Sequence, residues 1–233
     1  MCRTSLSISL VLWLLAYSSF GQTPSRFKPS GVRIGTDLLG IGYSIADRKQ
    51  FRYEINGDID IHKYFLTLDY GFSRYNRADT MTYHNDGHYF RIGADINLLK
   101  PDEFGNVVFL GLRYGHSFFN DDIQFTPTID QYYGAVKPIQ AHNNGIQAQW
   151  GEVVFGVKVQ VIKQFYLGFT GRYKMGMSQN GKGDFGPAIV PGYGTASQSS
   201  TFGFNYQLFY LIKWREKPLF VKPPKPVKPR DED

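Results

Sequence analysis

The stretch HNDGH contains side chains that could bind a transition metal. His84, Asp86 and His88 offer imidazole and carboxylate groups, which are common zinc ligands, within five residues. The stretch has no further committed ligand, and its polar composition is typical of an exposed loop. We therefore interpret it as a polar loop leading into a strand, and we predict no metal site and no cofactor.

A second group of oxygen ligands stands at residues 120–122. Asn120, Asp121 and Asp122 could help to hold a hard cation such as calcium. They lack the loop spacing of a dedicated calcium site. A solvated loop is the simpler interpretation.

A histidine followed by a serine could act in nucleophilic catalysis. His116 and Ser117 are adjacent, and adjacent side chains in a strand point to opposite faces, so they cannot serve each other as base and nucleophile. A serine with a histidine and an acid from neighbouring strands remains an alternative. We predict no catalytic residue, with His116 in an outer aromatic zone and Ser117 at the mouth of an interior.

The beginning of the chain reads as an export signal. Residues 1–21 combine a single early charge at Arg3, an apolar run and small residues before a cleavage point, which predicts a signal peptide and Gln22 as the mature N-terminus. The remaining sequence, within a total of 233 residues, suits one domain and contains no apolar run long enough for a transmembrane helix. The net charge of +6 is mild and scattered, so nucleic acid is not an expected partner.

Almost every later segment alternates apolar and polar residues with a period of two. This pattern predicts antiparallel strands. Eight are expected, over residues 31–39, 51–61, 63–75, 88–99, 106–118, 145–161, 164–177 and 200–214.

The predicted connections alternate in length. Tight turns follow the second, fourth and sixth strands, and long loops are expected at 76–87, 119–144 and 178–199, with a shorter one at 46–50. Short turns at one end and long loops at the other are the layout of a small up-and-down outer-membrane β-barrel. A ninth and tenth strand within 119–144 remain an alternative, since residues 123–129 also alternate.

The two faces of these strands are predicted to lie in different environments, one in lipid and one in the barrel interior. One face is apolar and aromatic, which suits lipid, whereas the other carries as many acids as bases. An eight-stranded barrel is just wide enough for side chains to fill it, so we interpret the polar face as a paired, plugged lumen. Its expected members are Arg33, Asp37, Arg52, Glu54, Asp58, Asp60, Asp69, Arg91, Asp95, Arg113, Glu152, Lys158, Arg172 and Lys174.

The domain plan that follows has four parts. Residues 1–21 form the signal peptide, 22–30 a periplasmic lead-in, 31–214 the barrel and 215–233 a proline- and lysine-rich periplasmic tail. The leading hypothesis is a non-enzymatic barrel whose long loops, with Tyr132 and Tyr133, give a structural or binding surface. Three alternatives stay open: a lipid A hydrolase or acyltransferase, a narrow pore, and a soluble periplasmic lipocalin-like barrel that binds a lipophilic ligand.

Three motifs add a family resemblance. GVRIGTDLL, KYFLTLDYGFSRY and GHYFRIGADINLL make residues 31–214 resemble a family of uncharacterised, exported, predicted outer-membrane barrel proteins of Bacteroidota. The resemblance implies a location and a fold, and no functional residue. The stretch TFGFNYQL resembles the insertion signal read by the barrel-assembly machinery, although here a tail follows it. The expected partners are therefore outer-membrane lipid, that machinery and a surface ligand.

Overall fold

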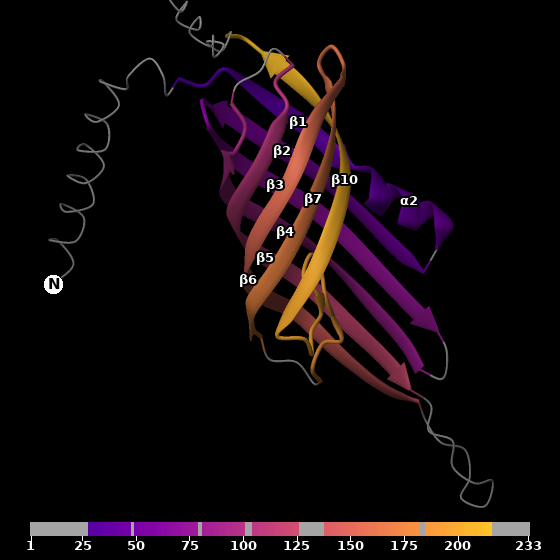
Figure 1. The fold of residues 1–233 in the computed structure, drawn as a ribbon. Helices are drawn as coiled ribbons and strands as arrows, with labels where there is room; N and C mark the ends of the chain where they lie inside the picture. The colour runs from indigo at the N-terminus through magenta and orange to yellow at the C-terminus, as the bar shows by residue number, and fades with distance from the viewer. Residues whose placement is uncertain are drawn as a thin grey trace, which may run out of the picture.

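Eight antiparallel strands close into a barrel in the computed structural model, which describes residues 28–47, 49–78, 81–100, 104–125, 138–181 and 185–215. The ring runs β1-β10-β7-β6-β5-β4-β3-β2, and β1 pairs with β10 to close it (Figure 1). The predicted fold is thus confirmed, with eight strands and not ten in the ring. Their bounds are β1 Gly31–Asp37, β2 Gln50–Ile61, β3 Tyr64–Ala78, β4 Met81–Asn97, β5 Val107–Phe125, β6 Ile139–Ile162, β7 Phe165–Asn180 and β10 Ser200–Lys213.

The tight turns gather at one end, which also holds the start of β1 and the finish of β10 (Figure 1). Two of these turns place a non-glycine residue in the left-handed region, His62 with φ 64° and Lys163 with φ 43°. Positive φ is what a two-residue hairpin turn requires, because it matches the twist of the flanking strands. We refer to this end as the turn end and to the opposite one as the loop end.

Strands continue where long loops are expected at the loop end. The prediction of a loop at 76–87 is wrong: β3 runs to Ala78 and β4 starts at Met81. Likewise, much of 119–144 belongs to β5 and β6, and the predicted extension is present at Ile123–Phe125. The alternation of apolar and polar residues is hard to see in these segments, because their outward residues are polar as well. Residues 126–137, including Tyr132 and Tyr133, lie outside the described residues, as do 1–27 and 216–233.

A helix replaces the end of the first predicted strand. β1 stops at Asp37, and α2 covers Leu38–Ala46. The Asp37 carboxylate caps the helix by accepting a hydrogen bond of 3.2 Å from the amide of Gly40. The sequence LLGIGYSIA is apolar all round, so helical periodicity gave no signal. No helix among the described residues is long and apolar enough to cross a membrane.

The barrel wall separates two very different environments. Inward positions are buried and mostly polar, whereas outward positions carry exposed large apolar side chains. On β4 and β5 the apolar band ends at His88 and Phe118, and polar residues follow towards the loop end. The band includes Ile34, Tyr53, Ile55, Leu66, Leu68, Tyr70, Ile92, Ile96, Leu110, Leu112, Phe155, Phe169, Phe202 and Phe204.

The segment 185–199 is folded, although a flexible external loop is predicted there. Strands β8 (Ile189–Val190) and β9 (Gly194–Thr195) pair as a small hairpin. Its Val190 and Tyr193 are buried in an apolar cluster with side chains from the wall, namely Tyr89, Phe119, Ile146, Ala148 and Trp150. The hairpin therefore packs into the barrel mouth. Below it, a second apolar cluster consists of Phe65, Val107, Phe109 and Val154.

Candidate functional site

The fourteen charged side chains of the predicted lumen all stand on the inward face. Thirteen are buried, and Arg52 retains 34% exposure of its side chain. The alternation of side chains along each strand places them there, because every second residue of a strand points inward. They form three layers between the turn end and the loop end.

The layer nearest the turn end is built around Asp58. Its carboxylate accepts from Arg33 Nε at 2.9 Å and from Lys158 Nζ at 2.6 Å. Three phenylalanine rings surround the Lys158 ammonium with centroids 4.9 to 5.5 Å away, namely Phe65, Phe109 and Phe209. Ring faces compensate a buried cation electrostatically, so this charge is held by a carboxylate and an aromatic cage together.

Asp69 is the hub of the middle layer. Its Oδ2 lies 2.6 Å from Arg113, 3.3 Å from Arg172 and 3.5 Å from Arg91. Asp95 and Glu152 provide further carboxylates for Arg113 and Arg172, at 2.9 and 3.2 Å. A buried charge is tolerated only when it is paired and hydrogen-bonded, and these guanidinium groups meet that condition.

These two layers pack closely against each other. The space left between them, lined in part by Asn56, Thr67 and Gln207, has a volume of only about 10 Å³. Such a space is about as large as one water molecule requires.

The layer at the loop end is centred on Glu54. It accepts hydrogen bonds from Arg91, from the hydroxyl of Tyr89 at 2.7 Å and from Asn56 at 2.8 Å. Beside it, Arg52 donates to Asp37 at 3.2 Å. Glu54 is therefore committed to neighbours within the wall.

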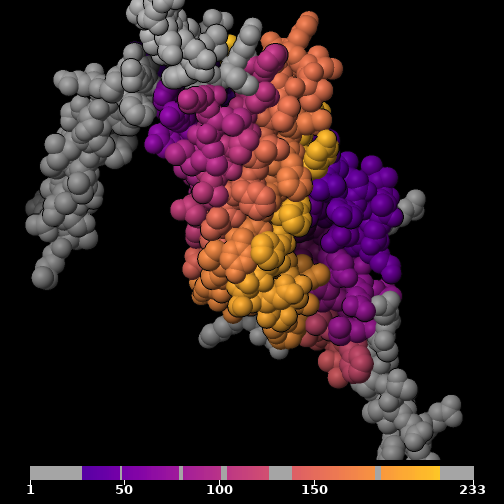
Figure 2. Space-filling view, viewed as in Figure 1, coloured from indigo at the N-terminus to yellow at the C-terminus, as the bar shows by residue number. Residues whose placement is uncertain are grey.

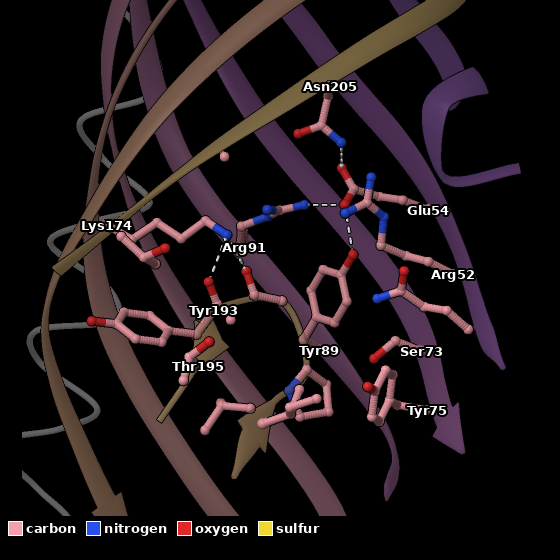
Figure 3. Close-up of a pocket in the computed structure, with 18 of the residues that line it drawn as sticks. Arg52, Glu54, Ser73, Tyr75, Tyr89, Arg91, Lys174, Tyr193, Thr195 and Asn205 are labelled. Carbon is pink, nitrogen blue, oxygen red and sulfur yellow. Dashed lines mark hydrogen bonds and ion pairs between the residues drawn. The ribbon is translucent and has the colours of Figure 1, made fainter. Parts of the chain in front are cut away.

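A pocket of about 250 Å³ opens above this layer, between β2, β10 and the β8–β9 hairpin (Figure 3). Lys174 points into it and donates to the carbonyl oxygens of Gly192 and Tyr193, at 2.7 and 2.9 Å. Among the described residues, no carboxylate lies within 4 Å of this ammonium group. Each of the other thirteen charged residues of the lumen lies within 4 Å of a group of opposite charge. The basic members of these ion pairs are Arg33, Arg52, Arg91, Arg113, Lys158 and Arg172.

The residues considered for metal binding lie on strands and not in a loop. His84, Asp86 and His88 project outward from β4, and His84 Nε2 lies 3.3 Å from Asp86. Within the described residues no group of three or more His, Cys, Asp or Glu side chains is arranged to hold a metal ion.

The oxygen ligands at 120–122 are divided between the two faces of β5. Asp121 is buried inward and accepts from the Tyr83 hydroxyl at 2.9 Å, whereas Asp122 faces outward beside His142 at 2.6 Å. Burial, together with the nearby Asp122 and Asp86 carboxylates, raises the pKa of Asp121 above its ordinary value. Burial and Asp121 likewise raise the pKa of Tyr83.

His116 and Ser117 also separate. The His116 ring lies on the outer face between Phe90 and Phe118, with centroid distances of 5.5 and 4.5 Å. Ser117 is fully buried inside, and its hydroxyl has no hydrogen-bond partner among the described residues. The pair therefore contains no nucleophile activated by a base.

A closed ring of eight antiparallel strands with an apolar outer face and a salt-bridged interior defines an outer-membrane-barrel-like fold. Within that class, the chain belongs to the family described as domain of unknown function DUF6048, whose model matches residues 1–217.

Two solved structures of small barrels are similar in fold. Neisserial surface protein A shares 15% identity at a TM-score of 0.37, with 83% of this chain and 100% of that one covered. CarO of Acinetobacter baumannii shares 10% identity at a TM-score of 0.38, with 82% of this chain and 100% of that one covered. No curated protein matches the chain in sequence.

The sequence interpretation missed the residues that close the pocket. Tyr193 and Val190 lie in a stretch rich in glycine and proline, which concealed their packing. The sequence PAIVPGYG did carry a signal, because an apolar pair and a tyrosine between turn residues are unusual for a solvated loop. The helix α2 beside the pocket was missed as well.

Proposed function

We propose that this protein is a membrane-spanning barrel of the outer membrane that neither conducts nor catalyses, and that acts through the surface and pocket at its loop end. The single observation that carries the proposal is the inverted distribution of side chains. Charges fill the interior, and large apolar side chains cover the exterior. A protein in water has the reverse arrangement, whereas a lipid-embedded barrel requires this one.

The arrangement also gives an orientation. In such barrels short turns face the periplasm and longer loops face outward. The turn end, with the start of β1 and the finish of β10, would then be periplasmic. Export by a signal peptide at 1–21 and insertion by the assembly machinery belong to the same proposal.

The interior favours a plug over a narrow pore. A conducting lumen needs a continuous aqueous path, but the middle layer leaves a space of about 10 Å³ between Asp69, Arg113 and their neighbours. Opening it would separate buried ion pairs, and breaking one such pair costs about 3–5 kcal/mol. The barrel is therefore expected to be closed at rest.

Two other candidate functions receive less support. A lipocalin-like barrel would turn its aromatic face inward, which is the opposite of the observed orientation. A lipid-modifying enzyme would need an activated nucleophile near the outer rim, and Ser117 and His116 lie on opposite faces.

The experiment is a fractionation followed by two measurements on the purified protein. We expect recovery with the outer membrane and a shift in gel mobility on boiling, because a closed barrel resists detergent until heated. In planar bilayers we expect no reproducible single-channel steps, with a trimeric porin as positive control. Recovery in the soluble periplasm without a heat-dependent shift would contradict the membrane location, and steady unitary conductance would contradict the plug.

A further inference from the structure

The barrel wall has a seam at the loop end. β1 has only seven residues, and its pairing stops at Thr36↔Ile55 on one side and Asp37↔Gln207 on the other. Beyond these points no strand among the described residues joins residues 50–54 of β2 to residues 200–206 of β10. The wall is therefore not a continuous sheet at this height.

The helix α2 covers this seam instead of a strand, and it contacts both β2 and β10. Its Ser44 hydroxyl accepts from the Arg52 amide at 2.8 Å, and the Asp37 carboxylate accepts from the Tyr206 amide at 3.2 Å. These are isolated bonds through side chains, so they hold the wall less tightly than a ladder does. The seam is thus the place where the wall can open at least cost.

The outer surface of α2 suits lipid. Residues Leu38–Ala46 contain no charged side chain, and Ile45 is 77% exposed. Figure 2 shows α2, in indigo, as a bulge on the outside of the wall beside β10. Next to it lies an apolar groove on the outer wall, lined by Ile34, Thr36, Tyr53, Ile55, Leu208 and Tyr210.

The pocket lies behind the seam. Arg52 lines it from β2 and Lys174 from β7, while Phe202 and Phe204 form its rim on β10. Phe202 is 69% exposed on the outer face of β10, so the strand edge that flanks the seam also borders the pocket. Gly203 leaves room for the lysine, because a Cβ there would stand 3.1 Å from Lys174 Nζ.

The charges of this pocket favour an anion. Glu54 is already committed to Arg91 and Tyr89. Among the described residues the Lys174 ammonium donates hydrogen bonds to carbonyl oxygens and has no carboxylate within 4 Å, and Arg52 is partly exposed. Phosphate and carboxylate oxygens form short, strong hydrogen bonds with such groups.

We propose that this pocket binds the anionic head of an amphiphile, a phosphate or a carboxylate, through Lys174 and Arg52. The acyl chain passes out through the seam between β2 and β10 and lies in the apolar groove beside α2. This inference rests on the proposed membrane location. It identifies anionic amphiphiles as the class of ligand that the loop end binds.

The test is native mass spectrometry of the full mature chain, refolded in a nonionic detergent. Dimyristoylphosphatidylglycerol is titrated against dimyristoylphosphatidylcholine, which has the same chains and a zwitterionic head. We expect the anionic lipid to bind about tenfold more tightly and with one molecule per barrel, a difference of about 1.4 kcal/mol. Lys174→Gln should abolish the preference, and Lys174→Arg should keep it.

Two further variants test the pocket without replacing Lys174. Arg52→Gln should weaken binding of the anionic lipid several-fold, and Gly203→Val should weaken it because the added side chain crowds Lys174 Nζ. Lys63→Gln is the matched control, because it removes an exposed lysine from the turn end. The heat-dependent gel shift verifies folding of each variant, and Arg52→Gln replaces Lys174→Gln as the decisive variant should the latter fail to fold.

Millimolar inorganic phosphate distinguishes the possible sources of the anion. Displacement of the anionic lipid by phosphate would support an oxyanion site that a free ion can fill. Lys174-dependent binding that phosphate does not displace would support a lipid ligand held by head and chain together. Equal binding of the two lipids, or unchanged binding by a folded Lys174→Gln variant, would overturn the inference while leaving the membrane barrel itself intact.

Discussion

Lys174 on β7 donates a hydrogen bond of 2.9 Å to the backbone carbonyl of Tyr193, in the hairpin that enters the barrel mouth. The two residues come from separate segments, and their contact fastens the hairpin to the wall. The Tyr193 ring packs edge-on against Trp150 with 5.7 Å between centroids. Polar contacts from Lys174 and Asn85 and the apolar packing of Tyr193 and Val190 together hold the hairpin, so the share of the Tyr193 ring can be tested.

Tyr193→Ala should release the hairpin without unfolding the barrel. Truncation of a buried aromatic side chain costs about 3–5 kcal/mol, and here the loss falls on a local element. We expect limited proteolysis to cleave within 185–199 in the variant and not in the parent, with the heat-dependent gel shift retained. Tyr43→Ala, which truncates an exposed tyrosine, is the control. Equal resistance of Tyr193→Ala and the parent would mean that the hairpin is held by other contacts.

Asp69→Asn should destabilise the whole barrel. Asp69 accepts hydrogen bonds from Arg113 and Arg172 and forms an ion pair with Arg91 in the middle layer. Neutralising it leaves buried positive charge uncompensated, at a cost of about 3–5 kcal/mol. The measurement is the urea concentration at which the folded gel band disappears.

The control for that experiment is Asp122→Asn, at an exposed pair with His142. A surface pair contributes at most about 1 kcal/mol, so this variant should resemble the parent. Similar midpoints for the two variants would argue against a central role of Asp69 in the network.

Two glycine-to-alanine substitutions should act in opposite directions. A Cβ on Gly115 would stand 2.2 Å from the Trp150 ring, whereas a Cβ on Gly42 of α2 meets no atom within 4 Å. Overpacking costs about 1–3 kcal/mol, and alanine favours a helix over glycine by about 1 kcal/mol. We expect Gly115→Ala to lower the unfolding midpoint and Gly42→Ala to raise it slightly.

Fluorescence gives this comparison a local readout. A Trp214→Phe variant that begins at Gln22, the proposed mature N-terminus, keeps Trp150 as its tryptophan. Its emission should shift in Gly115→Ala, because displacement of the ring disturbs the 2.7 Å hydrogen bond from Nε1 to Glu152. An unchanged spectrum and midpoint in this variant would contradict the close packing.

Asp121→Asn should remove a pH dependence at the loop end. The pKa of Asp121 is raised, so the folded state binds this proton more tightly than the unfolded state. Its contribution to the free energy of unfolding therefore falls as pH rises from the ordinary value of 3.8 through the raised pKa. The asparagine keeps an oxygen for Tyr83 and cannot ionise.

Urea titrations between pH 4 and pH 7 would measure this effect. We expect the stability of Asp121→Asn relative to the parent to increase with pH across that window. A constant difference would show that the carboxylate does not titrate differently in the folded state.

The alternation of the strands could be predicted from the residues alone. A period of two is a property of each strand alone, so the ring of eight, the apolar outer face and the shared inward face of residues such as Asp58 and Lys158 could be predicted without knowledge of neighbours. The ends of strands were less predictable, because polar residues around His84 resemble a loop once a strand leaves the apolar band.

Which charged groups meet in the lumen depends on the three-dimensional arrangement of the strands. Lys158 binds Asp58 across 100 residues of sequence, which depends on the tilt and closure of the whole barrel. The burial of Tyr193, the helix after Asp37 and the pocket at Lys174 arise in the same way. Each of these three features depends on the space between strands that are distant in the sequence. Local sequence patterns do not show that space.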